Sequence, residues 1–334
     1  MINLNELQKI GNQLNRPECV LSHRSGLLFC SDWSGSGGVS IIDPIGNVKR
    51  ILSKESDFIV RPNGIAIENS GSFLMAHLGE EDGGIFRLHP DGNLEAILLE
   101  IEGQKLAPSN YVHIDQLNRV WLTISTQHVP RSDAYRSDIN DGVIILIDES
   151  GPKIVAENLS YTNECLVHPD GNRLFVNETF GRRLTSFDIA KNGNLSNRKT
   201  ICEFAEGTYP DGMTFDEKGG IWITSIISNR VIRVLEDGSQ TILLEDMNLE
   251  HIKNVENAYL NHTLDKSHLN QVRSQKLNNI SSLAFGGPNL DIAYLGCLSG
   301  DHIAYFTSSV KGIAPNHWEA PLDKLLAVVS LKIN

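Results

Sequence analysis

The sequence has no apolar run that approaches the roughly 20 residues needed to cross a bilayer. Basic residues are also in the minority, because 29 lysines and arginines stand against 41 aspartates and glutamates, for a net charge of −12. An acidic chain is repelled by phosphate backbones, so nucleic acid is not an expected partner. The first residues lack the apolar segment that follows a basic start in secretory signals. We therefore expect a cytoplasmic protein that binds neither membranes nor nucleic acid.

Cysteine pairs are absent as well. None of the five cysteines forms a Cys-x-x-Cys motif, and their odd number leaves at least one thiol outside any intrachain disulfide. We expect reduced, mostly buried cysteines that act as small hydrophobic residues. The sequence also lacks His-Glu-x-x-His, so it shows no zinc motif, and none of the eleven histidines is assigned to a metal.

One pattern is present six times. It consists of a polar residue, an alternating apolar run, a turn rich in Gly, Asn or Asp, and a second apolar run. The clearest copy is PDGMTFDEKGGIWITS at 210–225. Alternation punctuated by such turns is typical of two strands joined in a hairpin. A further strand-like run follows each hairpin, which makes about four strands per repeat.

The spacing of the copies predicts an all-β, six-bladed β-propeller in a single domain, 1–334. The leading polar residues are Glu18, Asn63, Asn110, Asn163, Asp211 and Ser281, at steps of 45, 47, 53, 48 and 70. Four-stranded repeats of this length are typical of propeller blades. The long last step contains an insertion, 246–279, in which Leu249, Ile252, Val255 and Tyr259 follow helical spacing. This insertion is expected to pack on the rim, to cap the channel or to form a dimer contact, and no oligomeric state follows from the sequence.

Residues at the same position of six blades converge on the central channel, so these six polar residues are expected to meet. All of them offer oxygen, and two are carboxylates. Such a set suits one hard divalent cation, with Ca²⁺ favoured and Mn²⁺, Mg²⁺ or Zn²⁺ as alternatives. Each residue taken alone is also an ordinary turn residue, since Asn and Asp cap turns.

The chain resembles the family of gluconolactonase, regucalcin (senescence marker protein) and luciferin-regenerating enzyme. The resemblance covers about 15–315. It rests on PDGMTFDEKGGIWIT (210–224), NECLVHPDGNRLFVNETFGRR (163–183), FGGPN (285–289) and VKGIAP (310–315). It implies a six-bladed propeller with one divalent cation, held by Glu18, Asn163 and Asp211. By the same resemblance, Asn110 lies close to metal and substrate.

Three positions depart from the family pattern. Tyr111 stands where an acid is frequent, Pro108 where animal enzymes carry a lactone-binding Arg, and Glu164 where Gly is usual. These changes leave the expected metal ligands in place and put the substrate in question.

The resemblance implies a metal-dependent lactone hydrolase, acting on a sugar (aldono-) lactone. The cation would act as Lewis acid, and Asp211 would serve as both ligand and general base. The alternatives are a hydrolase of phosphotriesters or other esters on the same site, and a non-catalytic calcium-binding propeller.

Candidate substrate-binding residues lie on the inner strands and on two polar segments. In addition to Asn110, they are Asn63, Arg131 and Glu178. Arg131 belongs to the polar loop 125–142, where His128 and Arg136 are further candidates for binding a carboxylate or sugar hydroxyls. The alternative for Glu178 is a plain ion pair with Arg182.

Overall fold

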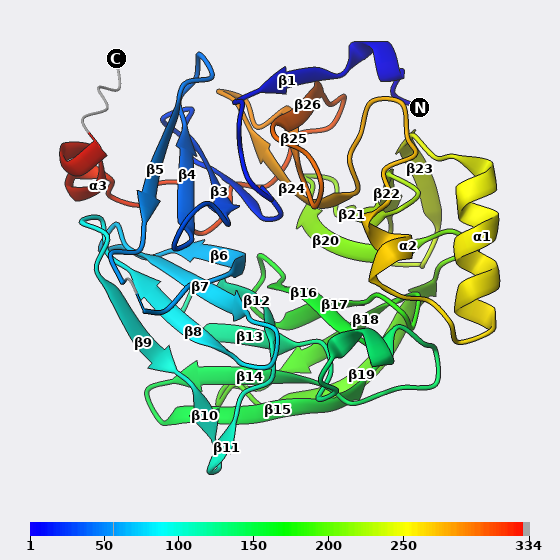
Figure 1. Ribbon diagram of the computed structural model, residues 1–334, viewed down its shortest axis with the longest axis horizontal. Helices are drawn as coiled ribbons and strands as arrows, with labels where there is room; N and C mark the ends of the chain where they lie inside the picture. The colour runs from blue at the N-terminus through cyan, green and yellow to red at the C-terminus, as the bar shows by residue number, and fades with distance from the viewer. Residues whose placement is uncertain (56, 330–334) are drawn as a thin grey trace.

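The computed structural model describes residues 1–55 and 57–329 and consists of six four-stranded antiparallel sheets around a central channel (Figure 1). Blade 1 contains β2 (Val20–Ser22), β3 (Leu28–Asp32), β4 (Gly38–Ile42) and β5 (Val48–Leu52). Blade 2 contains β6 (Pro62–Ile67), β7 (Phe73–Leu78), β8 (Gly83–Leu88) and β9 (Leu94–Leu98). Blade 3 contains β12 (Ser109–Ile114), β13 (Val120–Ile124), β14 (Gly142–Asp148) and β15 (Gly151–Leu159).

The next two blades repeat this order. Blade 4 contains β16 (Thr162–Val167), β17 (Arg173–Glu178), β18 (Arg183–Ile189) and β19 (Leu195–Glu203). Blade 5 contains β20 (Tyr209–Phe215), β21 (Ile221–Ile226), β22 (Arg230–Val234) and β23 (Gln240–Glu245). A small hairpin, β10 (Glu100–Ile101) and β11 (Gln104–Lys105), projects between blades 2 and 3. The predicted six-bladed propeller is confirmed.

Blade 6 joins the two ends of the described chain. It contains β24 (Ile280–Gly286), β25 (Ile292–Cys297) and β26 (Ile303–Thr307), and its outermost strand is β1 (Gln8–Ile10). Gln8 pairs with Tyr305 and Ile10 with Ile303, so the ring is closed by backbone hydrogen bonds between N-terminal and C-terminal strands. In Figure 1 the blue β1 lies beside the orange-brown β26.

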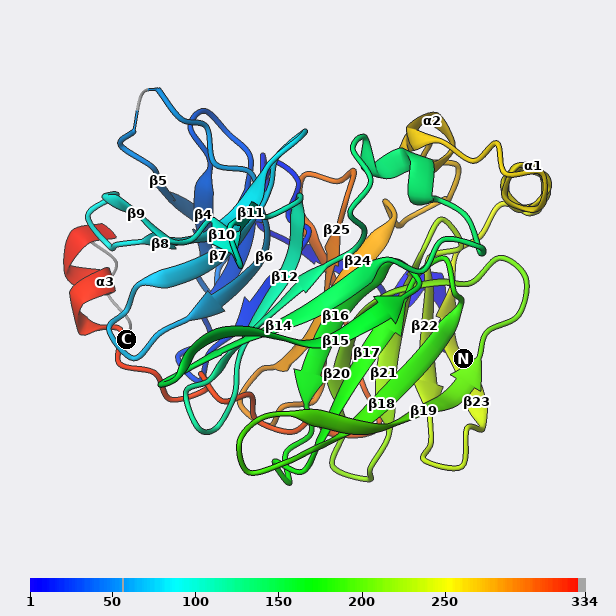
Figure 2. The ribbon, with the colours of Figure 1, turned by 90° about the horizontal axis from the view of Figure 1, so that it is seen from below.

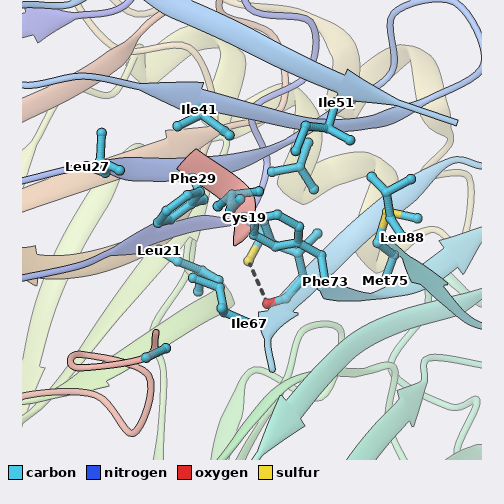
Figure 3. Packing of buried hydrophobic residues seen from close by; sticks show 14 of the residues in the cluster. Cys19, Leu21, Leu27, Phe29, Ile41, Ile51, Ile67, Phe73, Met75 and Leu88 are labelled. Atoms are coloured by element: carbon cyan, nitrogen blue, oxygen red, sulfur yellow. Dashed lines mark hydrogen bonds between the residues drawn. The ribbon is translucent and has the colours of Figure 1, made fainter. Parts of the chain in front are cut away.

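The core lies between neighbouring blades, because each sheet has apolar side chains on both faces. Figure 3 shows one such layer, in which Phe29 of blade 1 packs against Phe73 of blade 2 with ring centroids 5.5 Å apart. Burying a large apolar side chain of this kind contributes about 1.5–3 kcal/mol. Cys19 belongs to the same layer, with its thiol 3.8 Å from the carbonyl oxygen of Ile65. All five cysteines are free and buried, as expected.

The innermost strands carry a shared irregularity that positions the predicted site. Where β6, β12, β16, β20 and β24 pair with their neighbours, the register shifts at the segment that contains the leading polar residue, as between Pro210 and Met213 in β20. Such bulges re-aim side chains. Hydroxyls of the second strand satisfy the displaced amides, since Thr123 accepts from Tyr111 N and Thr224 from Gly212 N.

The two faces of the ring carry different additions (Figure 2). The loop after β13, with the 3-10 helix η2 (Arg131–Ala134), lies on the same face as α1 (Leu249–Leu260) and α2 (Lys266–Asn270). The segment after β26, which ends in α3 (Asp323–Val329), runs along the opposite face. A further 3-10 turn, η1 (Leu4–Glu6), precedes β1. None of the helices within the described ranges has the length and apolar character needed to cross a membrane.

The insertion is helical, as predicted, and packs on the rim beside blade 5 (Figure 1). Ile252, Val255 and Tyr259 are buried there among tyrosine and phenylalanine side chains. Leu249 differs from the sequence expectation because it is 63% exposed. Leu249 is the first residue of the helix, and helical spacing alone does not show whether the first turn is buried.

Candidate functional site

The leading polar residues meet at the end of the channel where the inner strands begin. The Asn63 amide donates to Glu18 Oε1 at 2.9 Å and to the carbonyl oxygen of Asn110 at 3.1 Å. The hydroxyl of Ser281 donates to the carbonyl oxygen of Glu18 at 2.8 Å. Blades 1, 2, 3 and 6 are therefore in direct contact through residues that are far apart in the sequence.

Four oxygen atoms of the leading polar residues are buried and have no hydrogen-bond partner among the described residues. They are Glu18 Oε2, Asn110 Oδ1, Asn163 Oδ1 and Asp211 Oδ1. Their residues are between 2% and 4% exposed. An unpartnered buried acceptor costs about 1–3 kcal/mol, so four together indicate a missing electrophilic partner. We call these four residues the oxygen cluster.

The carboxyl groups of the cluster are held in an unfavourable environment. Burial raises the pKa of Glu18 to about 7, although Arg16 and the Asn63 hydrogen bond oppose the increase. Burial, and then the charge of Glu18, raise the pKa of Asp211 well above its ordinary value. A divalent cation between them would remove both penalties, because it neutralises two carboxylates and accepts amide oxygens as ligands.

The donor set therefore fits a hard cation. Two carboxylates and two neutral amide oxygens are present, without sulfur or imidazole. Within 1–55 and 57–329, no three His, Cys, Asp or Glu side chains are grouped so as to hold a metal, which leaves the mixed acid–amide set as the candidate. The orientation of Asn163 supports this assignment. Thr179 accepts from its amide nitrogen at 2.9 Å, which leaves the amide oxygen as the free atom.

Asn63 and Ser281 support the cluster instead of completing it. The amide nitrogen of Asn63 donates to Glu18 and Asn110, and its amide oxygen accepts from Arg16 at 3.3 Å. Ser281 and Ser282 both donate to the Glu18 carbonyl. Both residues thus fix the position of Glu18.

Glu178 is not brought to the cluster. Its carboxylate accepts hydrogen bonds from Ser160 N at 2.6 Å and Arg183 Nε at 2.8 Å, and it is also paired with Arg198. The alternative pairing with Arg182 is wrong, because Arg182 bonds to Glu256 of α1. Sequence proximity favoured Arg182, whereas the antiparallel pairing of β17 with β18 places Arg183 directly opposite Glu178.

The loop 125–142 contributes one of its three basic candidates. Arg131 lies within electrostatic range of both Glu18 and Asp211. By contrast, His128 bonds to Asp141 at 2.8 Å and Arg136 to Asp138 at 2.7 Å. These two pairs belong to the loop itself.

Two charged residues near the cluster were missed. Arg16 precedes Glu18 in the loop that enters blade 1, and its guanidinium lies 4.5 Å from the Trp33 ring centroid. Glu164 is 2% exposed and accepts from Met213 N at 2.9 Å. Burial, followed by the charge of Glu18, raises the pKa of Glu164 well above its usual range. The Asn-Glu departure was the available signal for Glu164. For Arg16 the signal was the Arg-Pro pair that directly precedes the leading polar residue in two copies, at 16–17 and 61–62.

A cavity of about 1030 Å³ opens at the other end of the channel, which we call the far cavity. No residue of the oxygen cluster lines it, and its wall is largely apolar. Tyr111 and Glu164 lie at its inner end. Tyr111 also packs against the apolar residues of blades 1 and 2. The unpartnered acceptor oxygens lie in the oxygen cluster, whereas the unpartnered polar atoms of the far-cavity lining are two histidine nitrogens, His113 Nε2 and His317 Nε2.

The fold is shared with several solved structures. A luciferin-regenerating enzyme aligns with 19% identity over 92% of this chain and 97% of its own, with a TM-score of 0.67. A gluconolactonase from Xanthomonas campestris has 17% identity over 90% and 89% of the two chains, with a TM-score of 0.65. Regucalcin from Agrobacterium tumefaciens, a calcium-binding protein, has 15% identity over 91% of both chains, with a TM-score of 0.61.

The sequence also matches a defined protein family directly. Residues 16–245 match the SMP-30/Gluconolactonase/LRE-like region, and this stretch includes five of the six leading polar residues. Because the match covers more than half of the 334 residues, the chain belongs to the SMP-30/gluconolactonase/LRE-like family.

Proposed function

We propose that the protein is a metal-dependent hydrolase of a lactone, and that its substrate class is a sugar (aldono-) lactone. The observation that carries the proposal is the oxygen cluster, in which four blades each contribute one buried oxygen without a partner among the described residues. The gluconolactonase among the structural relatives supports the choice of a lactone.

In this proposal Glu18, Asn163 and Asp211 hold one divalent cation, Ca²⁺ being favoured by the all-oxygen donors, and Asn110 faces the metal or the substrate. A bound cation would polarise the lactone carbonyl and stabilise the negative charge that develops on its oxygen. The Asp211 carboxylate, a ligand in this proposal, would also accept the proton of the attacking water as general base. The ester bond to the ring oxygen then breaks, Asp211 returns the proton to that oxygen, and a hydroxy acid is released.

The test is proton release by EDTA-treated protein on a panel of aldono- and other sugar lactones, with Ca²⁺, Mn²⁺, Mg²⁺ or Zn²⁺ restored one at a time. Release is expected only with metal and only while Asp211 is present, so Asp211→Asn serves as the control. A panel of other esters and phosphotriesters, run in parallel, identifies the alternative hydrolase classes. Release that persists without metal would contradict the proposal.

A non-catalytic calcium-binding role is the second candidate, and the burial of the cluster favours it. Glu18 and Asp211 are only 2% and 3% exposed, which leaves little room for a substrate unless neighbouring residues move. Thermal unfolding with added Ca²⁺, combined with the turnover assays above, separates the two roles. At a concentration 100 times the Kd, a ligand stabilises the native state by about 2.7 kcal/mol. Stabilisation without turnover on any panel compound would identify the binding role.

A further inference from the structure

Two arginines lie beside the oxygen cluster without an acidic partner. Most arginines of the described chain form ion pairs, as Arg50 does with Asp32 and Arg233 with Asp216. Arg16 and Arg131 form none among residues 1–55 and 57–329, although each lies within electrostatic range of Glu18 and Asp211.

Arg16 is held in place by contacts that do not neutralise it. Its guanidinium stacks over Trp33, and one terminal nitrogen donates to Asn63 Oδ1 at 3.3 Å. Its Nε is buried and has no partner in the described structure. A buried, oriented guanidinium with an unused donor is a binding group for a planar or tetrahedral oxyanion.

Arg131 approaches from a different element. It begins η2 in the loop after β13, on the face where the inner strands begin (Figure 2). Tyr135 and Tyr161 lie close to it. Arg16 and Arg131 also lie within range of each other, so their like charges are held together.

The charges at this end of the channel do not balance without a further anion. Glu18 and Asp211 together offset one divalent cation. Arg16 and Arg131 add two positive charges, of which the nearby Glu164 can offset one, so at least one positive charge remains in a partly buried site, which is costly unless an anion pairs with it. A neutral sugar lactone supplies no such anion before the reaction begins.

We propose that Arg16 and Arg131 form an oxyanion-binding subsite, and that the substrate is an anionic lactone bearing a carboxylate or phosphate group in addition to the ring ester. This inference rests on the proposed function for the ring ester and on the two arginines for the anion. Carboxylate and phosphate share the chemistry that a guanidinium recognises, so the two are separated by experiment.

The test compares three lactones with the metal-loaded protein: a neutral aldonolactone, an aldaric acid monolactone and a phosphorylated aldonolactone. We expect kcat/KM for one anionic lactone to exceed that for the neutral lactone by at least about 100-fold. Arg131→Met and Arg16→Met should each reduce this ratio by at least about 10-fold, and Arg131→Lys should recover part of it. Arg136→Met is the matched control, because Arg136 lies on the same loop but pairs with Asp138.

Calorimetric binding of the corresponding open-chain acids, with and without metal, gives a readout that does not depend on turnover. One outcome is that no lactone is hydrolysed, but the open-chain aldaric acid, with its two carboxylates, binds to the wild type and binds more weakly to Arg131→Met. In that case the oxyanion subsite stands and the lactonase proposal fails. Hydrolysis of neutral and anionic lactones at equal rates, with equal losses in both arginine variants, would overturn the subsite. Absence of both anion binding and anionic preference would overturn it as well.

Discussion

Asp211 and Asp216 lie at opposite ends of one stretch of chain, and both are buried, yet their surroundings differ completely. Asp216, in the turn after β20, accepts from Lys218 N and Gly220 N at 2.8 Å each and from Trp222 Nε1 at 2.8 Å, and it pairs with Arg233. Asp211 has an oxygen with no partner among the described residues. The carboxylate of Asp216 is occupied by hydrogen bonds within the fold, whereas that of Asp211 is available to bind a ligand.

The pKa directions follow the same division. Burial alone would raise the pKa of Asp216, but Arg233 and the turn hydrogen bonds outweigh it and hold the pKa below its ordinary value. Burial and Glu18 raise the pKa of Asp211. Buried acids in this propeller are therefore distinguished as structural or functional by their hydrogen bonds and not by their depth.

The largest expected effect concerns Asp211→Asn. Loss of a ligand and proton acceptor should lower metal-dependent lactone hydrolysis by about 10²–10⁴-fold. The free energy of unfolding of the metal-free protein should stay the same or rise, because one unpartnered buried charge is removed. Initial rates and chemical denaturation measure the two effects. A large loss of stability in Asp211→Asn would break the comparison.

Asp216→Asn should show the opposite pattern. Removing this charge leaves Arg233 without its partner, and we expect the free energy of unfolding to fall by about 2–3 kcal/mol. The specific activity of the folded fraction, and its affinity for Ca²⁺, should remain close to wild type. Denaturation curves with activity measured on the same samples provide the check.

The pH dependence of stability should also distinguish the oxygen cluster, represented by Glu18, from the turn that contains Asp216. The native-state pKa of Glu18 is raised from 4.5 to about 7, so in metal-free protein its contribution is fully present below about 4.5 and is lost as pH rises through about 7. Asp216, with a lowered pKa, contributes stability that is lost instead as pH falls. Thermal unfolding of EDTA-treated wild type and Glu18→Gln across pH 4–8 isolates the contribution of Glu18. Only the wild type should lose this stability as the pH rises, because the variant has no carboxyl group to ionise.

The smallest expected effect sharpens the assignment of supporting residues. Asn63→Ala removes the hydrogen bond to Glu18 Oε1 but no unpartnered oxygen, so Ca²⁺ affinity should fall by about 10-fold. Isothermal titration measures the change. A loss as large as that in Asp211→Asn would place Asn63 among the ligands.

The propeller and the position of its polar residues could be read from the sequence because repetition encodes them. Four-stranded units at a regular period leave little freedom in fold, and equal positions in equal units converge. Thus Glu18, Asn63 and Asn110 were expected to meet, and their hydrogen bonds confirm it.

Side-chain pairing could not be predicted in the same way. Glu178 pairs with Arg183 because their strands are paired. Arg16 lies near Glu18 and Asp211. By contrast, Arg61, at the equivalent position before Asn63, donates to the carbonyl oxygen of Trp33. Neither relationship has a period, so each depends on the full set of neighbours in space.

The folded ring brings together residues from distant parts of the chain. Glu18 is near the beginning of the chain and Asp211 is close to two-thirds of the way along it. The hydroxyls of Ser281 and Ser282, which fix the Glu18 backbone, come later still. The oxygen cluster is therefore complete only when blades 1, 3, 4 and 5 are assembled, and serines of blade 6 anchor its Glu18 member. A cation that binds there would favour chains in which these blades are assembled, so its retention during refolding would report their assembly.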